Sequence, residues 1–169
     1  MDLKAHAKQL LSVSRRVTEG VAASLKTPDD WFYQAHPKAN FPLWIFGHLG
    51  LADNRFISQF RPQLANKPQG WDELFWFGSQ HNSDRSAYPS PDEVLAYFRE
   101  RRETLLKVLD EVTQDELNAP APAAGQRSPI AGAPSIGQLF LFAAVHEGLH
   151  GGQLTVAHRG LGNPPLMGS

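Results

Sequence analysis

The sequence predicts an all-α protein, a four-helix bundle in which long crossover connections join some of the helices. Apolar residues recur at helical spacing in four long segments. No segment shows the sustained alternation of apolar and polar residues, bounded by turn residues, that is typical of strands. The length of 169 residues suits one domain spanning residues 1–169, with a core large enough to fold without disulfides.

The four expected helices span residues 3–25, 42–60, 91–112 and 136–158. Pro42 suits a first helical turn, where its missing N–H costs nothing. Ser90-Pro91-Asp92-Glu93 is a capping box, and Ser135 is a plausible N-cap of the last helix. Thr27-Pro28-Asp29-Asp30 and Thr113-Gln114-Asp115-Glu116 each resemble a capping box that opens one or two turns.

The connections between the helices differ in character. Residues 61–90 are too apolar for an exposed loop, and we expect them to pack over an end of the bundle, with a short helix at 71–77. The aromatic residues that carry this expectation are Trp71, Phe75, Trp76 and Phe77. Residues 118–134 are rich in proline, alanine and glycine and should be irregular.

Composition excludes several classes of function. The 16 basic and 17 acidic residues give a net charge of −1, which argues against nucleic-acid binding. No apolar run approaches the ~20 residues that span a bilayer, and no secretory signal is apparent, so we expect a cytoplasmic protein without a membrane partner. The chain has no cysteine and 7 histidines, so a transition metal would need imidazole and carboxylate ligands.

Three histidines fall on expected core faces. His146 and His150 are four residues apart and share the apolar face of the last helix, while His48 lies at the centre of the apolar face of the second. Burying three unpartnered imidazoles is costly, and a shared divalent ion would resolve that cost. The alternative is that each is a hydrogen-bonded core histidine, and His48 supports a metal site only if its helix neighbours the last one.

The other four histidines are not expected to be ligands. His6 lies near the apolar stripe of the first helix and is a candidate core residue. His36 precedes a proline in a turn, His81 lies in a polar segment, and His158 lies near a helix C-terminus, where a positive charge is favourable.

The string His146-Glu147-Gly148-Leu149-His150 also matches the H-E-x-x-H pattern of zinc proteases. The extended form of that motif needs glycine and histidine where this chain has Gln153 and Val156, and no acidic residue follows Glu147 as a third ligand. We therefore expect the third ligand upstream, with His48 best placed. Three glycines at 148, 151 and 152 weaken the helix, which suggests a local need for close approach or space.

The stretch from His146 to Leu154 resembles the C-terminal signature of the DinB/YfiT-like superfamily. Members resemble a four-helix bundle with one histidine on the second helix and an H-x-x-x-H pair on the fourth, here His48, His146 and His150. The resemblance implies a divalent metal, often zinc or nickel, and frequently a homodimer. Some relatives are transferases or isomerases that use low-molecular-weight thiols, and many others have no assigned activity.

Three functional hypotheses follow from these residues. The first is a metal-dependent enzyme acting on a small, anionic molecule, of thiol S-transferase, lyase or isomerase type. Because the chain has no cysteine, any thiol must come from a small-molecule partner. The alternative is a non-enzymatic module that binds a metal or small ligand, for example in a stress response. The third is a hydrolase that uses metal-activated hydroxide.

Candidate residues for the chemistry lie beside the three histidines in the sequence. Glu147 would be the base of a hydrolase, although its place ~100° around the helix from His146 favours pairing with a neighbouring helix. Gln153 lies one turn beyond His150 and could orient a ligand. Arg55 and Trp44 share the face of His48 and are candidates for substrate binding.

Overall fold

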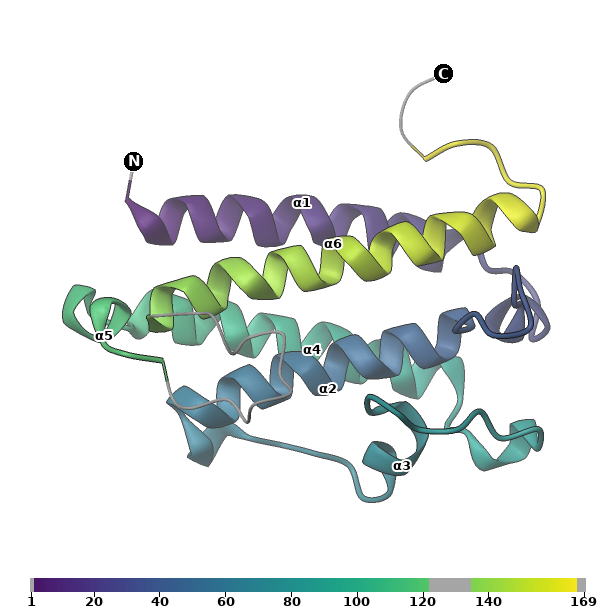
Figure 1. The fold of residues 1–169 in the computed structure, drawn as a ribbon, viewed down its shortest axis with the longest axis horizontal. Helices are drawn as coiled ribbons and strands as arrows, with labels where there is room; N and C mark the ends of the chain where they lie inside the picture. The colour runs from purple at the N-terminus through teal and green to yellow at the C-terminus, as the bar shows by residue number, and fades with distance from the viewer. Residues whose placement is uncertain (1, 122–134, 167–169) are drawn as a thin grey trace.

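Four long helices form the body of the protein in the computed structural model, which describes residues 2–121 and 135–166 (Figure 1). They are α1 (Leu3–Ser24), α2 (Pro42–Phe60), α4 (Pro91–Glu111) and α6 (Ile136–Gly160). The short elements are η1 (Asp30–Phe32), η2 (Pro62–Leu64), α3 (Trp71–Phe75), η3 (Arg85–Ala87) and α5 (Gln114–Asn118). Every regular element in the described ranges is helical, which confirms the predicted all-α class.

Side-chain caps fix most of the helix starts, as the sequence predicted. The Ser90 hydroxyl accepts a bond from the Glu93 backbone N–H at 3.3 Å, and the Glu93 carboxylate accepts one from the Ser90 backbone N–H at 2.9 Å. Thr113 and Glu116 make the same reciprocal pair and open α5. Thr27 and Asp30 also bond reciprocally but open only the single turn of η1. Most of the expected irregular segment 118–134 lies outside the described residues.

The long helices form two parallel pairs that run in opposite directions (Figure 1). α1 and α6 run parallel, because Leu3 lies beside Gly137 near their starts and Ser24 bonds His158 near their ends. α2 and α6 run antiparallel, since His48 contacts His150 while Phe60 contacts Phe140. α2 and α4 are parallel, so the segment 61–90 that joins them must return along the bundle as a crossover.

The crossover contributes to the core, but not with all of its aromatic residues. Trp71 and Phe75 are buried in the same hydrophobic cluster as residues of α2 and α4, as expected. Phe77 is 84% exposed, so the expectation that it packs on the bundle was wrong. The physical reason is that α3 ends at Phe75 and the chain then turns at Gly78, whose φ is +87°.

His6 is exposed, and its expected place in the core was also wrong. α1 packs on the bundle through Ala7 and Leu11, and His6 lies ~100° around the helix from Ala7. Its Nδ1 lies 3.0 Å from the Asp2 carbonyl oxygen, at the start of the same helix.

The outer face of α6 is apolar and open. Val145, Leu149 and Val156 are 55%, 65% and 57% exposed, and a Cβ built at Gly148 or Gly152 would meet nothing within 4 Å. The expected need was for close approach or space, and within the described residues these two glycines have open space and no close neighbour. No helix in this part of the chain combines the length and apolarity needed to cross a membrane.

Close packing against Phe75 requires a glycine at position 47. A Cβ at this position of α2 would lie 2.5 Å from the Phe75 ring, whereas ordinary van der Waals contact begins near 3.4 Å. The close approach lets α3 pack flat against α2 and places the end of α3 beside His48.

The contrast between these glycines gives a test. Gly152→Ala should raise the free energy of unfolding by up to about 1 kcal/mol, because alanine favours the helix and nothing obstructs its methyl group. Gly47→Ala should lower it, since the methyl group overlaps the Phe75 ring. Urea unfolding followed by circular dichroism measures both, and a destabilised Gly152→Ala protein would contradict the open geometry.

Candidate metal centre

His48 of α2 meets His146 and His150 of α6 where the two helices contact each other; His48 is buried, and the other two are half-buried. Each histidine offers one ring nitrogen, and these three atoms lie within 4.8 Å of one another. The Nε2 atoms of His48 and His146 are 3.2 Å apart. Two nitrogens bound 2.0–2.1 Å from one tetrahedral zinc ion would be about 3.3 Å apart. The spacing therefore fits a shared metal ion.

Hydrogen bonds orient two of the three imidazoles. His48 Nδ1 donates to the Phe75 carbonyl oxygen at 3.0 Å, and His150 Nδ1 donates to Gln153 Oε1 at 3.1 Å. Each bond places the ring proton on Nδ1 and leaves the Nε2 lone pair free for a metal. These two rings thus present the donor atom that a divalent ion needs.

The three imidazoles are held in their neutral form. Burial lowers the pKa of His48 from 6.5 to about 3, with further lowering by His150 and His146. Burial also lowers the pKa of His146 to about 4, helped by the positive charges of His150 and Arg102, and it lowers the pKa of His150 below 6.5. Neutral imidazole is the form that coordinates metals, so the site is prepared for an ion at neutral pH.

Aromatic rings surround the histidines. Trp44 stacks on His48 with 4.8 Å between ring centroids and 9° between planes, and its indole N–H donates to the Ser79 hydroxyl at 2.9 Å. Trp76 lies 5.7 Å from His48, and Phe142 lies 6.0 Å from His146. The crossover segment thus supplies part of the wall around His48.

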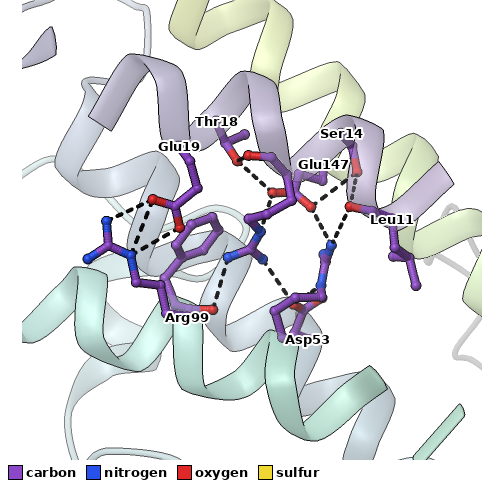
Figure 2. Close-up of polar contacts among 10 residues, drawn as sticks. Leu11, Ser14, Thr18, Glu19, Asp53, Arg99 and Glu147 are labelled. Carbon is purple, nitrogen blue, oxygen red and sulfur yellow. Dashed lines mark hydrogen bonds and ion pairs between the residues drawn. The ribbon is translucent and has the colours of Figure 1, made fainter. Parts of the chain in front are cut away.

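Glu147 follows His146 in the sequence, about 100° further around α6, and points toward Ser14 and Thr18 of α1 (Figure 2). Its side chain is fully buried, and both carboxylate oxygens are engaged. The partners are Arg15 Nε at 2.9 Å, Arg102 Nη1 at 2.6 Å, Thr18 Oγ1 at 2.7 Å and Ser14 Oγ at 3.3 Å. A carboxylate held this way is not free to act as a base beside the histidines.

Asp53 of α2 extends this contact into a buried cluster of four charges. It accepts bonds from Arg102 at 2.8 and 3.1 Å and lies 3.5 Å from Arg15, whose guanidinium also stacks 3.5 Å over the Phe98 ring. The two arginines and two carboxylates balance in charge and join α1, α2, α4 and α6. Sequence reasoning missed this cluster, although Asp53 stands out as an acidic residue within the apolar α2.

The remaining residues that the sequence singled out either contact a histidine of the triad or lie apart from all three. Gln153 contacts His150, as described, and Trp44 packs on His48. Arg55 is exposed, and its guanidinium pairs with no carboxylate among residues 2–121 and 135–166. His158 is buried, and its Nε2 donates to the Pro164 carbonyl oxygen at 2.7 Å while its Nδ1 lies 2.7 Å from the Ser24 hydroxyl oxygen.

These features define an all-α bundle with a three-histidine site, one ring buried and two half-buried, that could hold a metal ion. A sequence model of the DinB superfamily matches residues 10–154, a range that includes all three histidines. The chain therefore belongs to the DinB superfamily, which confirms the resemblance seen in the sequence. Neither the curated proteins nor the solved structures gave a match.

The buried charge cluster predicts that replacing one of its carboxylates by an amide of the same size lowers stability strongly. Glu147→Gln should lower the free energy of unfolding by about 3–5 kcal/mol, because two buried arginines would then share a single carboxylate. Urea unfolding of the metal-free protein measures the loss. Glu103→Gln removes the same charge from an exposed position of α4 and should change stability little. Equal effects of the two substitutions would contradict the cluster's importance.

The neutral histidines predict a pH dependence. Below pH 6.5 the unfolded chain takes up protons on His48, His146 and His150 that the folded chain binds only at lower pH, so stability of the metal-free protein should fall as the pH falls. Comparing unfolding free energies at pH 7.5 and pH 5 measures this loss. In His48→Gln the loss of unfolding free energy should be smaller, because one fewer histidine takes up a proton on unfolding. An unchanged loss would rule out the buried, neutral state of His48.

Proposed function

We propose that this protein is a metal-dependent enzyme acting on small molecules, with one divalent ion, zinc or nickel, held by His48, His146 and His150. One observation carries the proposal: three neutral imidazoles converge where α2 contacts α6, and hydrogen bonds orient two of them and leave Nε2 free for a metal. Three uncharged ligands would leave an ion its full charge and an open position, which is typical of catalytic rather than structural sites.

The reaction we favour is thiol transfer, or a related lyase or isomerase step that uses a low-molecular-weight thiol. A divalent ion with neutral ligands would act as a Lewis acid that stabilises an anionic ligand such as a thiolate. The chain has no cysteine, so the thiol would have to come from a small-molecule partner. Within the chain, the Phe75 carbonyl and Gln153 hold the imidazoles in place, while Trp44 and Trp76 keep water from His48.

The geometry does not favour the hydrolase hypothesis in the form that uses Glu147. Its carboxylate is fully buried and bonded to residues of α1 and α4 rather than exposed beside the triad. A non-enzymatic binding module remains the alternative to the enzyme, and the two experiments below separate them.

Metal content tests the site itself. Protein purified without a histidine tag should carry about one zinc or nickel ion per chain by elemental analysis. Substituting alanine for any one of the three histidines should remove most of it, because each supplies one of three protein ligands. His6→Ala, an exposed histidine, is the matched control. Full metal content in His146→Ala and His150→Ala would overturn the proposal.

Thiol-dependent turnover tests the enzyme. Zinc- or nickel-loaded protein should consume a small electrophile faster than background with at least one of glutathione, bacillithiol or mycothiol, and His48→Ala should reduce the rate to background. Chromatography of the electrophile and its thiol adduct measures this. A protein that binds one equivalent of metal but never exceeds background with any of the three thiols would be the binding module instead.

A further inference from the structure

A hollow of about 250 Å³ lies beside the triad, between the loop that follows η1 and the C-terminal half of α6. Its lining residues are Ala35, Lys38, Ala39, Asn40, Gln153, Val156 and Ala157. Gln153 links the hollow to the triad, since it lines the hollow and also accepts the bond from His150. A molecule in this hollow would thus lie one side chain away from a candidate metal ligand.

Each of the two amides that line the hollow already accepts one hydrogen bond from a histidine. Gln153 Oε1 accepts from His150 Nδ1 at 3.1 Å, and Asn40 Oδ1 accepts from His81 Nε2 at 3.1 Å. These bonds fix which end of each amide is the oxygen, and the NH₂ group at the other end can only donate. Both side chains therefore have an NH₂ group that can donate to a ligand.

The tautomer of His81 agrees with this assignment. Its Nδ1 lies 3.3 Å from Gln34 Nε2, an amide nitrogen that can only donate, so Nδ1 is the acceptor and Nε2 carries the proton. Burial also lowers the pKa of His81 below its ordinary value, which favours the neutral ring. Gln34 Nε2 donates as well to the Ala39 carbonyl oxygen at 2.6 Å, which fixes the loop against His81.

Lys38 adds a positive charge to the same hollow. It is exposed, and within the described ranges no carboxylate lies within 4.0 Å of its ammonium group. The other lining residues are three alanines and Val156, which are apolar. One cation and two N–H donors among apolar side chains favour a ligand that has an anionic group attached to a short aliphatic chain.

We infer that this hollow binds the carboxylate end of the substrate, with Lys38, Asn40 and Gln153 as its donors, and that the substrate is a small aliphatic acid or an acid-bearing thiol. The inference rests on the proposed function, because the reacting end of the same molecule would lie at the triad. The volume, slightly below the ~300 Å³ at which drug-sized pockets begin, limits the ligand to a short chain.

Two thiols that differ only in charge test the inference. By calorimetry, zinc-loaded protein should bind 3-mercaptopropionate about tenfold more tightly than 3-mercaptopropionamide. Lys38→Gln should abolish that preference without changing zinc content, because residue 38 lies outside the triad. Lys26→Gln, another exposed lysine from the same end of the bundle, should keep it. Equal binding of the two thiols, or a preference that survives Lys38→Gln, would overturn the inference while leaving the metal site intact.

A second measurement does not depend on metal or thiol. In amide NMR spectra of the metal-free protein, butyrate should shift the side-chain NH₂ resonances of Asn40 and Gln153, and butyramide should not. Lys38→Gln should remove the butyrate shifts. Failure to bind zinc would refute the proposed function without affecting the butyrate shifts. Absent butyrate shifts, or shifts unchanged in Lys38→Gln, would refute the carboxylate subsite.

Discussion

Two arginines and two carboxylates pair in the middle of the bundle, and the relative placement of its four long helices depends on that pairing. Buried ion pairs add little stability over apolar packing, but an unpaired buried charge is very costly. If α6 slid by one turn or rotated, Glu147 would leave Arg15 and Arg102 without their partner. The pairing therefore penalises other arrangements of α6. Because His146 and His150 have a fixed angular position relative to Glu147 on the same helix, the constraint also directs them toward α2.

The triad gathers three imidazoles in a site from which water is largely withdrawn. Burial makes a positively charged ring costly, and a charged neighbour would add to that cost, which is why the pKa values of His48 and His146 are so low. A neutral imidazole keeps a lone pair that a divalent ion can accept. The burial that disfavours protonation of these rings thus leaves them in the form that binds a metal.

Local signals in the sequence predicted the helices and the histidine phases, because capping boxes, prolines and residues four apart act within one helix. Long-range contacts could not be predicted in this way. Spacing alone did not show that α2 lies beside α6, on which the role of His48 depends. Glu147 finds its partners on α1 and α4, far away in the sequence. The bond to His48 comes from a backbone carbonyl, and every residue carries one, so no residue type could have indicated it.

The carbonyl of Phe75 has a consequence for how this site can diverge. A backbone acceptor persists through any substitution at position 75, so changes of residue identity there leave the partner of His48 Nδ1 chemically unchanged. A gain or loss of residues between α2 and α3 would instead move the acceptor and turn the imidazole away. To keep this ring orientation, a relative must retain the length of the crossover more than its composition, while the side chains around the site can change.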